Sequence, residues 1–405
     1  MSWEYKTLDQ LGEVARGRSK HRPRNDPSLF GGEYPFIQTA DVKAANFYIT
    51  EYDTTYNEKG LAQSKLWHPG TLCITIAANI ADTGILAMDA CFPDSVMGFL
   101  PYEGVADVRF VKYCFDILQQ NCKKISQGAA QDNLSWEKLS TILFPAPPIE
   151  VQKRIADMLS AYDDLIENNQ KQIKLLEEAA QRLYKEWFVD LRFPGHETTP
   201  LTDGIPEGWQ YSPLSEVFDF VRGKSYTSKE LSDTVGVLMA NLKNIRAFGG
   251  YKRNAEKRFT GQFKENQTLA AGDVVMGVTD MTQERRLVGH VALVPDMGEA
   301  MTFSMDLIKI IPKLTDKLFV YSALYYGGLS KQISPLANGV NVLHLKPEAM
   351  MGIEMLIPHD AIVRAYHERI SPIIVRIEAL QKQCDIAAEA RDRLLPKLMN
   401  GEIEV

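Results

Sequence analysis

The opening motif of this chain occurs a second time near its middle. Trp, Tyr and Leu occupy the same places in residues 3–8 and 209–214, and Arg, Gly and Ser occupy the same places in residues 14–19 and 220–225. The two stretches align without a gap. Each copy continues through short apolar runs and turns and closes in a long helical pattern. Solenoid repeats have periods of only about 20 to 50 residues. We therefore interpret the repeat as a duplicated domain, which suits a protein that contacts two similar places a fixed distance apart.

The 405 residues have room for two or three domains, and an apolar content of 45% is that of an ordinary globular protein. Short runs at 71–76 and 84–87 predict strands, and 107–124 predicts a helix. We predict an α+β fold with two similar mixed α/β domains, each followed by a long helix. The predicted segments are a first domain at 1–148, a helical region at 149–193, a linker at 194–208, a second domain at 209–358 and a second helical region at 359–405.

Apolar residues recur at alternating steps of three and four along both helical regions, which is the heptad pattern of a coiled-coil seam. In the first region the seam comprises Ile155, Leu159, Tyr162, Ile166, Asn169, Ile173, Leu176, Ala180, Leu183 and Trp187. In the second it comprises Tyr366, Ile370, Ile373, Ile377, Leu380, Cys384, Ala387, Arg391, Leu394 and Leu398. A helix of about 40 residues is roughly 60 Å long. We expect Pro372 to kink the second helix or to mark its first turn.

A seam on a single long helix cannot bury itself, so we predict that the two helices pair as an antiparallel coiled coil within the chain. Asn169 and Arg391 are polar seam positions of the kind that fix the register of such a pair. If the midpoints align, Asn169 lies near Cys384, and Arg391 lies near Tyr162 in a cation-π contact.

Catalytic motifs are missing from the sequence. Gly223-Lys224-Ser225 resembles the end of a phosphate-binding loop, but Phe218 occupies the position of its first glycine. No Gly-x-Gly-x-x-Gly motif follows a strand, no Pro-Pro-Tyr methyl-transfer motif occurs, and the seven histidines form no triad or metal spacing. We expect no catalytic residue, no metal site and no cofactor bound by this chain. An enzyme such as a nuclease or a self-sufficient methyltransferase is therefore the weakest interpretation.

The cysteines and the apolar segments bear on location. Five cysteines are scattered without a Cys-x-x-Cys pair, which favours buried free thiols. The chain opens without a basic and then apolar run, and its most apolar stretch, 71–92, contains Asn79, Asp82 and Asp89, which are unfavourable in a bilayer. We expect a soluble cytoplasmic protein with no membrane partner.

Basic side chains cluster at matching places in the two copies. The net charge of −7 argues against binding nucleic acid by bulk attraction, but a total can hide local basic surfaces. The first copy carries Arg16, Arg18, Lys20, His21, Arg22 and Arg24. The second carries Arg222 and Lys224 at the places of Arg16 and Arg18, followed by Lys243, Arg246, Lys252, Arg253, Lys257 and Arg258. A single loop of this kind is most simply explained as a solvated surface. Because two such loops occur at equivalent places, contact with phosphates is an equally good explanation.

Base recognition requires side chains with paired donors and acceptors, such as Arg for guanine and Asn or Gln for adenine. The candidates in the first copy are Gln38, Thr39, Asn79, Lys123, Lys124, Ser126 and Gln127. The candidates in the second copy are Asn241, Lys243, Asn244, Arg285, Arg286, Ser304, Lys331, Asn338 and Asn341. Any one of them taken alone is better explained as a turn or capping residue. Sequence choice should lie where the copies differ, between the opening motif and the closing helix.

Four motifs together resemble one known family. They are the repeated opening with Arg-Gly-[Arg/Lys]-Ser, the segment 125–134 (Ile-Ser-Gln-Gly-Ala-Ala-Gln-Asp-Asn-Leu), the proline-rich exit at 144–155, and the ending at 393–403 (Arg-Leu-Leu-Pro-Lys-Leu-Met-Asn-Gly-Glu-Ile). Each motif is weak alone, but their order along the whole chain resembles the specificity subunit of Type I restriction-modification enzymes.

The resemblance implies two target recognition domains, each reading one half of an interrupted, asymmetric site in double-stranded DNA. It implies helices that space the halves and dock two methyltransferase subunits, which bind S-adenosylmethionine, and a restriction and translocase subunit that uses ATP with Mg. Catalysis would reside in those partners. After Pro358 the second copy departs from the first, with 359–364 replacing the pattern of 148–153, so the two helices need not bind partners identically.

A second function class stays open at this point. An assembly scaffold with two protein-binding modules on a coiled coil, and no DNA contact, would also need a duplicated domain. The basic loops favour DNA recognition, whereas the acidic total favours the scaffold. The bases recognised, the spacer length, the order of the domains along the site and the presence of a restriction subunit are not encoded in any recognisable pattern.

Overall fold

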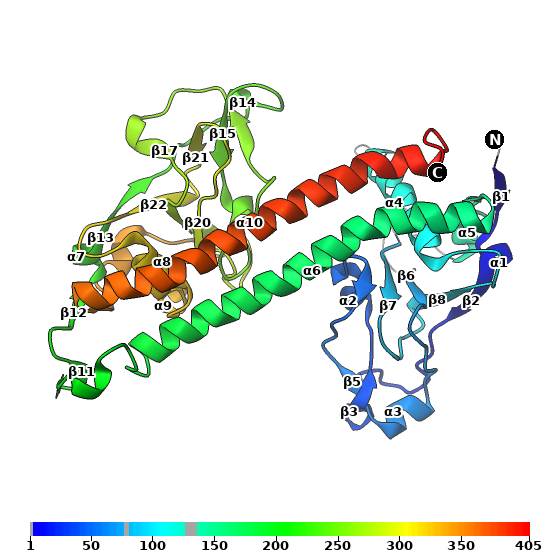
Figure 1. Ribbon diagram of the computed structural model, residues 1–405, viewed down its shortest axis with the longest axis horizontal. Coiled ribbons are helices and arrows are strands. Elements are labelled where there is room, and N and C mark those ends of the chain that lie inside the picture. The colour runs from blue at the N-terminus through cyan, green and yellow to red at the C-terminus, as the bar shows by residue number, and fades with distance from the viewer. Residues whose placement is uncertain (1–2, 77–80, 126–135) are drawn as a thin grey trace. The chain divides into compact units, whose positions relative to one another are not determined.

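The computed structural model describes residues 3–76, 81–125 and 136–405, without the side chains of 121–125 and 136 (Figure 1). The chain divides into two compact units. Unit 1 comprises Met1–Gln170 and Gln383–Val405, and unit 2 comprises Lys171–Lys382. Each unit therefore combines one globular domain with a segment of each of the two long helices.

The globular domains share one sheet topology. In unit 1 the sheet order is β2 (Gly12–Arg16), β8 (Val96–Pro101), β6 (Leu72–Thr75), β7 (Thr83–Leu86) and β4 (Tyr48–Ile49). In unit 2 the order is β13 (Phe218–Arg222), β22 (Leu307–Pro312), β18 (Val274–Gly277) and β20 (Val291–Leu293). The first four strands occur in the same chain order and are antiparallel neighbours in both sheets. The duplication seen in the sequence therefore extends to the strand topology.

The start and end of each domain are also joined in the same way. The strand β1 (Glu4–Lys6) pairs with β9 (Phe144–Ala146), and β12 (Gln210–Pro213) pairs with β24 (Glu354–Ile357), both antiparallel. Each pair holds the opening motif beside the segment that enters the long helix. The long helices are α6 (Ile149–Phe188) and α10 (Asp360–Met399).

The domains differ outside this shared frame. Among its described residues, unit 1 adds only the small pair β3 (Phe30–Pro35) and β5 (Thr55–Tyr56). Unit 2 has a second, five-stranded sheet with the order β14 (Leu231–Ser232), β16 (Lys257–Phe259), β15 (Val237–Ala240), β21 (Met301–Phe303) and β17 (Thr268–Leu269). The helix α4 (Val108–Ile125) of unit 1 is represented in unit 2 by α8 (Lys317–Tyr325) and α9 (Leu329–Ile333), separated at Gly328.

Short elements complete the fold. Unit 1 contains α1 (Leu8–Leu11), α2 (Thr39–Ala44), α3 (Glu58–Ala62) and α5 (Trp136–Leu139), and unit 2 contains α7 (Leu214–Val217), β19 (Thr279–Asp280) and β23 (Leu343–His344). Between α6 and β12 the chain forms a small hairpin of β10 (Leu201–Thr202) and β11 (Ile205–Pro206). The strands predicted at 71–76 and 84–87 and the helix predicted at 107–124 are confirmed as β6, β7 and α4.

Within unit 1, the segments of α6 and α10 contact each other antiparallel. The Asn169 amide donates to Gln383 Oε1 at 3.3 Å, and the Cys384 thiol lies 3.8 Å from the backbone oxygen of Ile166. Asn169 therefore lies within a helical turn of Cys384, as the seam predicts. Deeper in the unit, Ile155 and Leu159 are fully buried in a cluster that includes Leu395 and Leu398.

Within unit 2, the helix segments also run antiparallel, but their contacts are mainly apolar. Ile173, Ile377 and Leu380 form one buried cluster with Leu176 and Ile373 at its border. Near the end of α6, the ring centroids of Trp187 and Tyr366 are 5.9 Å apart. Pro372 lies inside α10, which begins at Asp360, so the expectation that Pro372 marks the first turn is wrong.

The predicted partner of Arg391 is also wrong. Its guanidinium forms an ion pair with Asp163, the neighbour of Tyr162, and another with Asp392 at 2.8 Å. Asp163 is 2% exposed and accepts a 2.5 Å hydrogen bond from the Tyr113 hydroxyl. Burial raises the pKa of Asp163, while Arg391 and Tyr113 oppose that rise. A buried carboxylate attracts the guanidinium more strongly than a ring face does, because it carries a full charge in a poorly solvated place.

Candidate nucleic-acid interface

The repeated Arg-Gly-[Arg/Lys]-Ser motif has the same structural setting in both units. In unit 1, Gly17 follows β2, its N–H donates to Val96 O at 2.9 Å, and an added Cβ would lie 2.3 Å from Pro93 O. In unit 2, Gly223 follows β13, its N–H donates to Leu307 O at 3.1 Å, and a Cβ would lie 2.0 Å from Ser304 O. Only glycine permits this backbone approach. The motif therefore fixes where the flanking basic residues leave the sheet.

In unit 1 the segment 16–24 presents several exposed cations. Arg24 pairs with Asp94 at 2.7 Å, and Arg22 Nη1 donates to the backbone oxygens of Ser19 and His21 at 2.7 and 2.8 Å. Arg16, Arg18 and Lys20 are exposed. These three form no ion pair with any residue in the described part of the chain. They are therefore available to an anionic partner.

The same segment is held in a defined course by its neighbours. Gln63 Oε1 accepts hydrogen bonds from the backbone N–H groups of Lys20 and His21 at 2.6 and 2.9 Å. The His21 ring lies 2.7 Å from Asp26. The Ser28 backbone N–H, together with the Ser28 and His21 side chains, lowers the pKa of Asp26 to about 2. The loop is thus anchored while its basic side chains remain exposed.

Three predicted residues of unit 1 come together around one hollow. Arg24, Gln38 and Thr39 line it with Asn25, Thr54 and Ser95, and Phe30, Phe36 and Pro93 form its apolar wall; its volume is about 410 Å³. The Gln38 backbone N–H is fixed by Asp41 at 2.7 Å. The Gln38 amide donates to Thr54 Oγ1 at 3.4 Å. Its side chain is exposed, so donor and acceptor are both accessible.

In unit 2 the corresponding basic residues are more strongly paired. Arg222 makes two bonds to the Glu348 carboxylate, at 2.7 and 2.9 Å, and lies over the Phe220 ring. Lys224 is half-buried and Lys243 is exposed. The two copies thus share the position of the motif but not the number of free cations.

The prediction that Asn241 and Asn244 contact DNA is wrong, because both side chains are buried. They are 4% and 0% exposed. The Asn241 side chain accepts from Lys243 N at 3.0 Å and donates to Ala255 O at 2.7 Å, and the Asn244 amide donates to Lys252 O and to Glu256, both at 2.9 Å. Both amides cap the short turn Leu242–Asn244 and cross-link its surroundings. They are not available to base edges.

Two loops of unit 2, which we call the twin loops (residues 281–287 and 338–342), bring together most of the other predicted residues. Their bases are joined by the antiparallel pair β19 and β23, and the Gln283 amide donates to Val340 O at 2.8 Å. Arg286, Asn338 and Asn341 are exposed and Arg285 is half-buried. Burial lowers the pKa of His290, which follows the first loop in the chain, and the exposed Lys331 of α9 lowers this pKa further.

A buried carboxylate shapes the first of these loops. Asp280 is fully buried and accepts N–H bonds from Thr282, Leu287 and Val288 at 2.8, 2.6 and 3.2 Å. Burial alone would raise the pKa of Asp280, but these N–H bonds lower it on balance. The loop between β19 and residue 288 is therefore fixed from inside by a charged acceptor.

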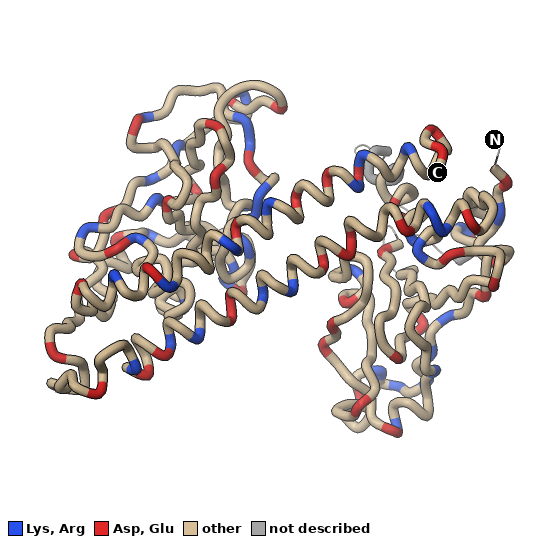
Figure 2. The backbone as a smooth tube through the Cα atoms, viewed as in Figure 1, with Lys and Arg blue, Asp and Glu red and all other residues tan. Residues whose placement is uncertain are grey.

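Other predicted residues lie where the structure gives no side-chain position. Asn79, Ser126 and Gln127 lie outside the described residues, and Lys123 and Lys124 belong to α4 without described side chains. Ser304 is fully buried, so it is not part of an exposed surface. In Figure 2, Lys and Arg alternate with Asp and Glu along each long helix, without a continuous basic stripe.

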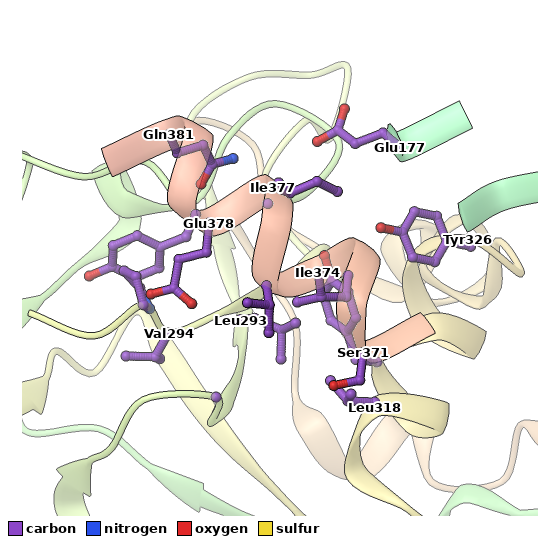
Figure 3. Close-up of a pocket in the computed structure, with 16 residues that line it drawn as sticks. Glu177, Leu293, Val294, Leu318, Tyr326, Ser371, Ile374, Ile377, Glu378 and Gln381 are labelled. Carbon is purple, nitrogen blue, oxygen red and sulfur yellow. The ribbon is translucent and has the colours of Figure 1, made fainter. Parts of the chain in front are cut away.

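Unit 2 also contains an apolar pocket of about 220 Å³ beside α10 (Figure 3). Ile374 and Ile377 of α10 line it, with Glu177 and Tyr326 on one side and Glu378 on another. Burial raises the pKa of Glu177, which Arg246 opposes. Glu378 is engaged by Arg253 at 3.3 Å and by the Asp296 N–H at 2.9 Å. None of the predicted DNA-contacting residues lines this pocket.

No three His, Cys, Asp or Glu side chains gather as metal ligands within 3–76, 81–125 and 136–405. Over the same ranges, no helix combines the length and the apolar character needed to cross a bilayer.

Comparison with known proteins gives consistent matches. Residues 1–178 match the family model described as the Type I restriction modification DNA specificity domain. The Type I restriction enzyme MjaIX specificity subunit of Methanocaldococcus jannaschii is 27% identical over 430 aligned positions, which cover 100% of this chain and 94% of that protein. The HindI specificity subunit of Haemophilus influenzae is 21% identical, covering 97% of this chain and 98% of that protein.

A solved structure supports the fold. The crystal structure of the Type I restriction-modification S subunit from M. genitalium superposes with a TM-score of 0.61 at 13% identity, covering 98% of this chain and 96% of that one. The predicted α+β architecture, with two similar mixed domains each followed by a long helix, is therefore confirmed. In sequence, the chain is similar along its whole length to specificity subunits of Type I restriction-modification enzymes, and its first 178 residues match the family model.

Proposed function

We propose that the chain is the non-catalytic subunit that selects the DNA site of a Type I restriction-modification complex, with each globular domain reading one half of an interrupted, asymmetric site. The observation that carries the proposal is the shared frame of the two units. The same sheet order and the same glycine-fixed basic motif occur twice, while the elements around them differ. A common frame can position two domains on DNA in the same way, and the differing elements can then select different bases.

The chemistry of the exposed residues supports this division of roles. Phosphate contacts fix position and base contacts provide specificity. Arg16, Arg18 and Lys20 are suited to phosphates because they are exposed and have no acidic partner among the described residues. Gln38 in unit 1 and the exposed amides of Asn338 and Asn341 in unit 2 are suited to base edges in the major groove. The net charge of −7 is compatible with this because the cations are concentrated locally.

The long helices suit spacing and docking. Each helix has 40 residues, and each keeps large apolar side chains outside the seam. In unit 1, Met158 and Leu165 are 41% and 44% exposed, and in unit 2 Leu175 and Val375 are 65% and 62% exposed. Such residues suit the binding of partner subunits, which we propose to be two methyltransferase subunits. We further propose that S-adenosylmethionine, ATP and Mg are bound by the methyltransferase and restriction subunits, not by this chain, and that the complex acts in the cytoplasm.

Methylome sequencing tests the proposal. A host carrying this chain with its methyltransferase subunit should gain methylated adenines in an interrupted, asymmetric motif, and a host carrying the methyltransferase alone should not. A methyltransferase that modifies the same motif without this chain, or a gained motif that is continuous, would contradict it. Assembly of the complex without any gained motif would instead favour a scaffold with two protein-binding modules.

A further inference from the structure

The twin loops of unit 2 carry an unusual pair of apolar side chains. Val340 is 85% exposed and Met281 is 76% exposed, and these are the largest values for any large apolar side chain in the described part of the chain. The two residues lie on loops that are joined by the bond from the Gln283 amide to Val340 O. A partner that removes exposed apolar area from water gains about 25 cal/mol of free energy per Å². A contact that covers both tips would therefore be favourable.

The loops are held in a fixed shape before any partner arrives. The second loop is closed by paired backbone bonds between Asn338 and His344, at 3.0 and 2.9 Å. Gly339 has a φ of 150°, and a Cβ there would lie 1.9 Å from Val342 O. In the first loop Arg285 has a φ of 52°, and its buried Nε has no hydrogen-bond partner in the described residues. Strained backbone and unpaired buried donors are concentrated at functional sites.

The surroundings of the two tips are cationic and rich in amides. Arg285, Arg286 and Lys331 lie on or beside the twin loops, and Glu284, which pairs with Arg286 at 3.5 Å, is the single acid within them. Asn338 and Asn341 flank Val340 in the second loop. Cations, amides and small apolar groups are the side chains that contact phosphates, adenine edges and the thymine methyl group in the major groove. Charge complementarity thus favours DNA as the occupant of this surface.

We propose that Val340 and Met281 contact the 5-methyl group of a thymine in the half-site read by the second domain. This inference rests on the proposed function and names one chemical group of the DNA that the second domain would recognise. The valine side chain extends only one carbon beyond Cβ, so it is too short to separate stacked base pairs. It can, however, cover a methyl group that projects into the groove. The exposed amides of the same loop then select the neighbouring base edges.

Deoxyuridine substitution tests the contact directly, because it removes only the methyl group and leaves the pairing and the O4 acceptor unchanged. The full chain with its methyltransferase subunits is titrated against duplexes carrying the motif found by methylome sequencing, with each thymine replaced in turn. One replacement should weaken binding about fourfold, the effect of re-exposing one methyl-sized group. In the M281S–V340S variant the thymine duplex should already bind about fourfold more weakly, and the same replacement should have no further effect.

Val235→Ser is the matched control, because Val235 is a 60% exposed valine of the same unit outside the twin loops. It should keep the full deoxyuridine effect. Equal deoxyuridine effects in the wild type and the M281S–V340S variant, or no effect at any thymine, would overturn the inference while leaving sequence-directed methylation intact. If methylome sequencing finds no motif that depends on this chain, the proposed function and this inference both fail.

Discussion

The two domains agree in their frame and differ in what surrounds it. Both have the same four-strand order and a glycine that brings the basic motif against the neighbouring strand. Unit 1 adds a small strand pair and a hollow lined by Gln38, whereas unit 2 adds a five-stranded sheet and the twin loops. The duplicated frame is therefore alike in both units, while the surrounding elements differ. Under the proposed function, this division would let both domains bind DNA in the same way and select different bases.

The helix segments show a second contrast between the units. In unit 1 a buried ion pair, Asp163 with Arg391, joins them, and in unit 2 the apolar cluster of Ile173, Ile377 and Leu380 does so. Removing one member of a buried pair leaves an uncompensated charge, which costs about 3 to 5 kcal/mol. Truncating a buried isoleucine costs about 2 to 5 kcal/mol through lost packing. The two losses should be similar in size but different in their dependence on pH.

Arg391→Met should lower the free energy of unfolding by about 4 kcal/mol near neutral pH. Burial raises the pKa of Asp163 in the folded state, and Arg391 opposes this rise. Without Arg391 the folded carboxyl binds a proton more readily than the unfolded one, so the variant regains stability as pH falls through the folded-state pKa of Asp163. Urea unfolding at a series of pH values measures this. Ile377→Ala serves as the control, since the stability that it loses should not vary with pH. If the stability lost by Arg391→Met is also independent of pH, the argument from the Asp163 charge is excluded.

The basic motifs should contribute unequally to DNA binding. Replacing Arg16, Arg18 and Lys20 with Ala should weaken binding about 100-fold and reduce the slope of log affinity against log salt by up to about 2.7. Replacing Arg222 and Lys224 should weaken binding only about tenfold, because Glu348 already holds Arg222. Salt titrations of both variants measure the difference. An unchanged slope in the first variant would remove that loop from the DNA surface, provided that methyltransferase subunits still bind.

The glycines of the shared frame should be equally sensitive in both units. Gly17→Ala and Gly223→Ala would each place a Cβ within 2.3 Å of a backbone oxygen, and overpacking of this kind costs about 2 kcal/mol. Gly352→Ala is the matched control, because a Cβ there meets nothing within 4 Å. Thermal unfolding of the three variants gives the comparison. If alanine is tolerated at one of the two glycines but not at the other, the frames of the two units are less alike than their sheet topology indicates.

Local patterns in the sequence predicted much of this fold. The repeat, the long helices and the strands at β6 and β7 depend on periodicity and turn residues, which act over short distances. The partner of Arg391 was missed because Asp163 lies beside the seam, not on it. The burial of Asn241 and Asn244 depends on Glu256 and on the backbone of Lys252 and Ala255, whose approach no local pattern indicates.

The candidate site was predictable as a set of residue types but not as a surface. Arg24 and Gln38 line one hollow only because β3 and its neighbours bring them together. The twin loops meet through the pairing of β19 with β23, which are far apart in the chain. Long-range strand pairing of this kind is not visible in periodicity. The exposed tips, Val340 and Met281, were missed for the same reason, since single apolar residues in loops carry no sequence signal.

Gln38 and Asn244 offer the finest test of the comparison, since both are amides but only Gln38 is exposed. Gln38→Ala should relax the preference for one base in one half-site about tenfold, the loss of a bidentate contact, and leave the other half unchanged. Asn244→Ala should leave both preferences unchanged, because its amide is used by Lys252 O and Glu256, and should lower thermal stability instead. Methylome sequencing of hosts carrying each variant separates the two outcomes. A relaxed preference from Asn244→Ala would mean that sequence choice depends on the interior of the domain more than on its exposed amides.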